Sequence, residues 1–164
     1  MQRVYIEFTS PKKWFKPFSW AIRLFQGTPY SHVRLRWIST TGEELIYEAS
    51  GSAVKLIGRY AQDKYTVKVH HSYHVNLDRP QYKRLIGLFR YASVDYGQWQ
   101  ALGIPLADVF CLKKNPLSKG RRKQVCSELV GYFIQEVLQI KVPKDFDLLI
   151  PKDIKEFLDR NLVQ

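Results

Sequence analysis

The chain of 164 residues has only two cysteines and one methionine, and its 15 acidic residues are outnumbered by 26 basic ones. Two cysteines are too few for a disulfide framework, so we expect a reducing compartment. No stretch approaches the roughly 18 consecutive apolar residues of a membrane span. The N-terminal segment has no apolar signal core, so we expect no secretory leader and a cytoplasmic location. These absences exclude membrane spans, coiled coils, collagen and disulfide-knot folds.

The composition is that of a folded domain with an excess of positive charge. Apolar residues make up 45% and aromatic residues 14%, which is too rich for an intrinsically disordered chain. A chain of this length buries about 70% of its unfolded surface, so one domain over residues 1–164 needs no disulfide or metal to hold a core. The net charge of +11 has three explanations: the protein binds nucleic acid, it binds anionic lipid, or the charge serves only to keep it in solution.

Alternation of apolar and polar side chains in the first half predicts strands over residues 3–8, 30–38, 45–49, 53–57, 65–70 and 73–77. A turn at residues 40–43 joins the second and third strands as a hairpin. In the second strand, Val33, Leu35 and Trp37 face one way, and His32, Arg34 and Arg36 face the other. Residues 14–25 are rich in aromatic side chains and predict a short helix.

The second half changes to helical spacing. Asp78 caps a predicted helix that contains Tyr82, Leu85, Ile86 and Phe89. The clearest helix runs from Cys126 to Ile140 and carries one continuous apolar stripe. Pro151 suits the first turn of a last helix. Strands first and helices later predict an α+β domain with an antiparallel sheet packed against helices.

Cys126 is the side chain whose position most favours chemistry. It lies at the predicted start of a helix, where the dipole and unpaired backbone N–H groups favour a thiolate. A thiolate nucleophile needs a base for its proton and N–H donors for the oxyanion. The alternative is that Cys126 is a small buried apolar side chain, as free cysteines often are. Cys111 precedes no predicted helix, and we interpret it as structural.

His32 is the candidate base, and Glu48 is the candidate carboxylate beside it. The two residues lie on successive predicted strands. If these strands pair as a hairpin, Glu48 lies beside His32 and holds the imidazole in the tautomer that a base needs. Each residue also has a plainer interpretation, which is a solvent-exposed polar side chain on a strand.

Together, three short motifs resemble those of a known family, the circularly permuted NlpC-type papain-like cysteine peptidases and amidases. The motifs are Tyr30-Ser31-His32-Val33, Tyr47-Glu48-Ala49 and Cys126-Ser127-Glu128-Leu129-Val130. In ordinary papain-like enzymes the cysteine helix comes before the histidine strand, whereas here His32 precedes Cys126 by 94 positions. The resemblance covers most of the chain, including residues 3–8, 14–25, 96–97 and 148–153.

The resemblance implies a permuted papain-like fold and a cysteine hydrolase that attacks an amide or ester carbonyl. It implies Cys126 as the nucleophile, His32 as the general base and then the acid, and Glu48 as the residue that orients His32. The backbone N–H of Cys126 would contribute to the oxyanion hole. Tyr96 is the nearest match to a tyrosine that lines this hole in related enzymes, and Tyr91 is the alternative.

The expected substrate is a peptide, an amide or a lipid ester, and no cofactor is expected. The wider family includes cell-wall peptide amidases and lipid-acting acyltransferases, so the substrate and the choice between hydrolysis and acyl transfer stay open. Glu128 fits the family motif, although at a helix start it can simply complement the dipole. His70, His71 and His74 have no cysteine or acid to complete a ligand set, so we expect no metal site.

The alternative from another class is a binding module for nucleic acid or anionic lipid. Six Lys and Arg residues lie in the Lys113–Lys123 loop, and Arg34 and Arg36 would extend that footprint. In an enzyme, the same loop would help to keep the Cys126 thiolate charged and attract anionic substrates or surfaces, with no obligate nucleic acid. A third possibility is a catalytically degenerate family member.

The aromatic cluster over residues 14–25 is interpreted as core, although its lysines also suit a membrane surface.

Overall fold

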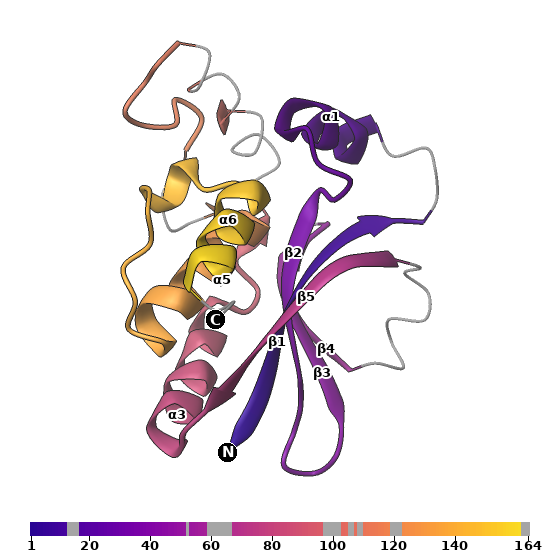
Figure 1. Cartoon of the computed structure of the whole chain (residues 1–164), viewed down its shortest axis with the longest axis vertical. Helices are drawn as coiled ribbons and strands as arrows, with labels where there is room; N and C mark the ends of the chain where they lie inside the picture. The colour runs from indigo at the N-terminus through magenta and orange to yellow at the C-terminus, as the bar shows by residue number, and fades with distance from the viewer. Residues whose placement is uncertain are drawn as a thin grey trace.

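The structure is built on a twisted sheet that carries helices against one face (Figure 1). This computed structural model describes residues 1–12, 17–51, 53–58, 67–96, 103–104, 107, 110–118 and 123–161. The order of its elements is that of an α+β protein, which confirms the predicted class. Within the described ranges, no helix combines the length and apolar character needed to cross a bilayer.

Five long strands lie side by side in the order β5-β1-β2-β3-β4, and each neighbouring pair is antiparallel. They are β1 (Gln2–Pro11), β2 (His32–Ile38), β3 (Glu44–Ser50), β4 (Ala53–Gly58) and β5 (Val67–Leu77). Two short strands extend the β4 edge, namely β6 (Asp95–Tyr96) and β7 (Lys123–Gln124), which is parallel to β6. Because β7 ends two residues before Cys126, this edge fixes where the cysteine helix begins.

The helices are α1 (Pro17–Gln26), α3 (Arg79–Gly87), α5 (Cys126–Tyr132) and α6 (Pro151–Asn161). Single 3-10 turns cover Leu88–Tyr91 and Phe146–Leu148, and a π-helical segment (Phe133–Val137) continues α5. The predicted cap of α3 is confirmed, since Asp78 Oδ1 accepts the backbone N–H of Gln81 and the Gln81 side chain accepts the N–H of Asp78.

The core lies between the sheet and α5. The inward side chains of β1 and β2 are fully buried, and they are Val4, Ile6, Phe8, Val33, Leu35 and Trp37. From the helix side, the predicted stripe is buried against them through Leu129, Val130, Phe133, Ile134 and Val137. The segment that opens with Cys126 is therefore held by apolar packing on the sheet, where each fully buried side chain contributes about 1.5–3 kcal/mol.

The opposite face of β1 and β2 carries a charged cluster. Arg34 donates to Glu7 Oε2 from Nε at 2.9 Å and from Nη2 at 2.7 Å, and Arg36 bridges Glu7 and Glu44. Both Arg34 and Glu7 are about 5% exposed. Arg34 and Arg36, which were expected to extend a nucleic-acid footprint, are thus both paired with carboxylates on this face.

Two predicted element boundaries are wrong. The strands expected over residues 65–70 and 73–77 are one strand, β5, in which a bulge at His70, opposite the step from Phe8 to Thr9 on β1, lets the pairing continue; residues 65–66 lie outside the described part. The helix expected over residues 126–140 ends at Val137, since its last turn is π-helical and Gln139 follows with a φ of 60°.

The interpretation of the N-terminal aromatic cluster as core is wrong for Trp20 and Phe25. Both side chains are exposed on α1. Trp14 and Phe15 lie outside the described residues, and so does the side chain of Phe18. Of the basic loop, the structure describes residues 112–118, and Lys119, Arg121 and Arg122 lie outside the described part.

Candidate active site

Cys126 is the first residue of α5 and is only 4% exposed. The preceding Val125 is extended, with φ −101° and ψ 162°, and its N–H donates to Glu128 Oε2 at 3.0 Å. Ser127 Oγ donates to the carbonyl of Leu149 at 2.5 Å. Glu128 therefore does more than complement the dipole, because it caps the helix and fixes the backbone that presents Cys126.

His32 and Glu48 lie on neighbouring strands and are hydrogen-bonded to each other. His32 Nε2 is 3.1 Å from Glu48 Oε2, with 17% and 12% of the side chains exposed. The β2–β3 register pairs Leu35 with Tyr47, so Glu48 lies one step beyond the last paired positions and diagonally across from His32. Ser50 Oγ donates to the other carboxylate oxygen, Glu48 Oε1, at 2.6 Å.

The third contact joins His32 to Cys126. The Cys126 side chain lies close enough to the imidazole to raise the pKa of His32, through its charge and hydrogen-bonding capacity. Because Nε2 faces Glu48, Nδ1 is the ring nitrogen left for the sulfur. The structure thus brings together the three side chains that the sequence selected, in the order Cys126, His32, Glu48.

The electrostatics of this relay favour the charged forms. Burial disfavours the imidazolium, but the charge and hydrogen bond of Cys126, followed by those of Glu48, outweigh burial and raise the pKa of His32 to about 10. Burial likewise favours the neutral carboxyl group, but His32, Ser50 and Arg34 outweigh it and lower the pKa of Glu48 to about 2. At neutral pH the site therefore holds a cationic imidazole beside an anionic carboxylate, with the Cys126 side chain next to the same ring.

Sequence reasoning missed two supporting residues, Ser50 and Arg34. Ser50 is two positions after Glu48 on the same strand, so period-two alternation places both on one face. That spacing was a usable signal for the Ser50 hydrogen bond. Arg34 is two positions after His32 and adds positive charge next to Glu48. Its burial depends on Glu7 in β1, which no local pattern indicates.

The two candidate oxyanion tyrosines have different positions. The backbone of Tyr96 pairs with Gln124, two residues before Cys126, whereas its side chain lies outside the described part of the structure. The Tyr91 hydroxyl donates to Glu136 at 3.3 Å, and its ring stacks on Tyr132. Glu136 follows Cys126 by ten residues on the same helical segment, or about 15 Å at α-helical rise. Tyr91 therefore does not line the site.

Neither Cys111 nor the histidine cluster adds to the site. Cys111, which was interpreted as structural, is an exposed free cysteine. His70 Nε2 is 2.8 Å from Ser10 Oγ on β1. No group of three or more histidine, cysteine, aspartate or glutamate side chains among the described residues has an arrangement that holds a metal ion.

A cavity of about 550 Å³ lies close to the start of α5. The described lining residues come from α1, from the stretch that contains Ile104, Ala107, Cys111 and Leu112, and from the segment that enters α6, and they include Phe25, Leu148, Ile150, Lys152 and Glu156. Leu148 and Ile150 flank Leu149, whose carbonyl accepts the Ser127 hydrogen bond. The cavity thus borders the segment that holds the first turn of α5, although Cys126 is not among its described lining residues.

No protein-family model matches this chain, and no curated protein matches its sequence.

Proposed function

We propose that this protein is a cysteine hydrolase of the permuted papain-like type, with Cys126 as nucleophile, His32 as base and acid, and Glu48 as the residue that positions His32. The observation that carries the proposal is the relay from Cys126 through His32 to Glu48, with a buried sulfur at the first residue of a helix. A structural cysteine needs neither the imidazole nor the carboxylate behind it.

The arrangement of elements supports the same proposal. The cysteine helix packs against the central strands β2 and β3, which carry His32 and Glu48. The chain order is histidine, then carboxylate, then cysteine, as the resemblance to the permuted NlpC-type enzymes implies. The antiparallel order β5-β1-β2-β3-β4 puts β2 and β3 next to each other, so one hairpin supplies both partners of the sulfur.

In the acylation step, the Cys126 sulfur attacks the carbonyl carbon and forms a C–S bond. The oxygen takes up the electron pair and is stabilised by the backbone N–H of Cys126 at the start of α5. As the C–N or C–O bond breaks, His32 Nδ1 gives its proton to the leaving amine or alcohol. Glu48 holds Nε2 throughout, so the imidazole needs no reorientation.

In the deacylation step, the neutral His32 takes a proton from water, and the hydroxide attacks the thioester carbonyl. The C–S bond breaks, a carboxylic acid leaves, and the proton on His32 restores the thiolate–imidazolium pair. Another acceptor in place of water gives acyl transfer by the same steps. The expected substrate is an amide or ester of a peptide or a lipid.

The experiment is capture of the acyl-enzyme with p-nitrophenyl acetate, followed by intact mass. We expect a burst of nitrophenol and a protein mass increased by one acetyl group, with the acetyl on the Cys126 peptide. Cys126→Ala should abolish both signals, and Cys111→Ala should retain them, because Cys111 is exposed and outside the relay. Acetylation of Cys111 at the same rate as Cys126 would overturn the proposal.

A further inference from the structure

Helix α1 exposes large apolar side chains to solvent, whereas an ordinary surface helix turns them toward the core. Trp20 and Leu24, one turn apart, are 56% and 67% exposed. Among the described side chains, the side that faces the protein carries polar groups beside the half-buried Ile22, since Ser19 Oγ lies 2.5 Å from Ser31 Oγ and Gln26 is buried. A surface helix normally buries its apolar stripe. Here the apolar stripe points outward.

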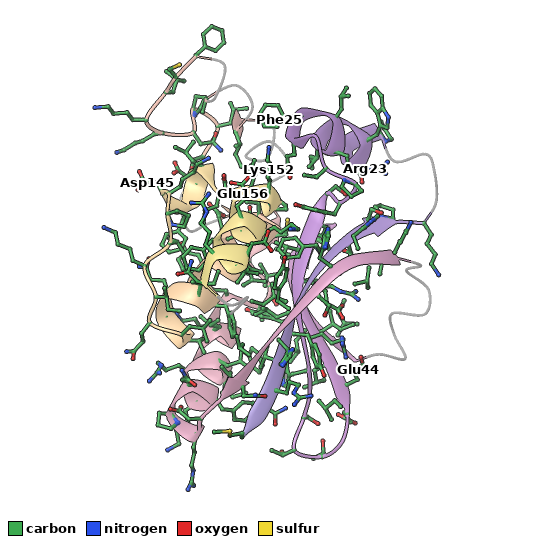
Figure 2. All side chains as sticks on the ribbon, viewed as in Figure 1. Arg23, Phe25, Glu44, Asp145, Lys152 and Glu156 are labelled. Carbon is green, nitrogen blue, oxygen red and sulfur yellow. The ribbon has the colours of Figure 1, made fainter. Side chains whose placement is uncertain are left out.

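A second segment continues this apolar exposure. Phe110 is 64% exposed, and Leu112 and Leu117 are exposed as well. This segment lies next to α1, because Phe25 and Leu112 line the same cavity. Figure 1 shows the two segments together at one end of the molecule, and Figure 2 shows Phe25 near Lys152 and Glu156 of α6 at that end. Apolar exposure of this extent marks an interaction site.

The charge of the two segments has one sign. Residues 17–30 and 110–118 contain no aspartate or glutamate, whereas they contain Arg23, Lys113 and Lys114. Both lysines are exposed. The surface is therefore complementary to an anionic partner that also accepts large apolar side chains, and the net charge of +11 adds long-range attraction.

We propose that this apolar-basic surface, made by Trp20, Leu24, Phe25, Phe110, Leu112 and Leu117 with Lys113 and Lys114, docks the protein onto an anionic lipid bilayer. Tryptophan and leucine on an amphipathic helix enter the boundary between headgroups and acyl chains, and nearby lysines bind anionic headgroups. Nucleic acid fits less well, because the aliphatic side chains Leu24 and Leu117 offer no stacking surface for bases. Docking is independent of Cys126, so it stands whether or not the proposed hydrolase activity does.

The experiment is cosedimentation of the full chain with vesicles of phosphatidylcholine alone or mixed with phosphatidylglycerol. We expect binding to the mixed vesicles only, weakened by salt. Trp20→Gln and Leu24→Gln should each reduce the partition coefficient about tenfold, the effect of withdrawing one large apolar side chain from the membrane. Lys113→Gln and Lys114→Gln should each reduce it about fivefold. Cys126→Ala should bind as the unmodified protein does.

The matched control is Ile86→Gln, which removes a 42% exposed apolar side chain from α3. It should leave binding unchanged, and circular dichroism should show all variants folded. Three outcomes would overturn the proposal: no binding to the mixed vesicles, an equal loss in the Ile86 variant, or equal binding to neutral vesicles. A dimer that Leu24→Gln dissociates would assign the surface to a second copy instead. Tight duplex DNA binding with no vesicle binding would assign it to nucleic acid.

Discussion

His32 Nε2 lies 3.1 Å from Glu48 Oε2, and this hydrogen bond leaves Nδ1 as the ring nitrogen that faces Cys126. The pair therefore fixes the direction of the imidazole ring before any substrate arrives. A thiol buried at the start of α5 has an acceptor for its proton, and that acceptor is itself held by a carboxylate with a lowered pKa.

The first prediction concerns the ionisation of His32. Its pKa is raised to about 10 because Cys126 and then Glu48 outweigh the effect of burial. Nitrogen-detected NMR of the imidazole should show the cationic form through neutral pH. In Cys126→Ala the first of these favourable partners is lost, so the titration should move down toward 6.5, the ordinary histidine value. An unmoved titration in that variant would mean that the sulfur does not act on the ring.

The second prediction concerns stability as a function of pH. A group whose pKa is raised by folding stabilises the protein at pH values below its pKa in the unfolded state. It loses that contribution as the pH rises through its pKa in the folded state. The free energy of unfolding lost in His32→Gln should therefore shrink between pH 6.5 and about 10. Folding lowers the pKa of Glu48 instead, so the contribution of Glu48 to stability is lost as the pH falls from 4.5 toward about 2. Urea unfolding across pH measures both, and a constant difference between the proteins would contradict the ion pair.

The third prediction separates Glu48 from an ordinary strand carboxylate. Glu48→Gln should lower kcat on an activated ester by about 10²- to 10⁴-fold, the range expected when the orientation of a general base is lost. Glu44→Gln is the matched control, since Glu44 lies on β3 four residues earlier and pairs with Arg36 instead. It should leave kcat within about twofold of the value for the unmodified protein. Equal losses in both variants would mean that Glu48 only stabilises the strand.

The fourth prediction concerns the packing that holds α5. A Cβ at Gly131 would lie 2.8 Å from Leu149 Cδ1 and 3.0 Å from Phe146 Cδ1, and Leu149 is fully buried. Gly131→Ala should therefore lower the free energy of unfolding by about 1–3 kcal/mol. It should also slow acylation, because Leu149 accepts the Ser127 hydrogen bond beside Cys126.

Gly87→Ala is the control for this substitution. Its Cβ would meet only Arg90 Nη1, at 3.8 Å, so it should be neutral or should raise the free energy of unfolding by about 0.4–1 kcal/mol. Denaturant unfolding with m-values compares the two variants. Equal effects would show that the contact of Gly131 with Leu149 is not tight.

Much of the sheet was predictable because its signals are local. Val4, Ile6 and Phe8 alternate with polar residues, and the turn containing Gly42, with a φ of 84°, sets the hairpin of β2 and β3. That hairpin predicted that Glu48 lies beside His32. The start of the predicted helix separately marked Cys126 as the candidate nucleophile. The contact between Cys126 and His32 was not derivable from spacing alone, since 94 residues separate the two positions.

The features that the sequence concealed depend on distant partners. Arg34 was expected to extend a basic footprint, but Glu7 on β1 pairs with it in a buried ion pair. β5 is continuous only because a bulge against β1 absorbs one residue. Trp20 was assigned to the core by composition, yet Ser19 and Gln26 take the inward positions on α1 and leave it exposed. In each case the burial or pairing of the residue depends on a second element that is distant in the sequence.

The most direct test of the central claim is competitive alkylation of the two cysteines by iodoacetamide at about pH 6, where a thiol of ordinary pKa is only about 0.3% thiolate. Exposure favours Cys111 and burial disfavours Cys126. Quantitative peptide mass spectrometry should nevertheless show Cys126 reacting at least about tenfold faster, and His32→Gln should remove that advantage. Labelling of Cys111 as fast as Cys126 in the unmodified protein, with no effect of His32→Gln, would contradict an activated thiolate at the start of α5.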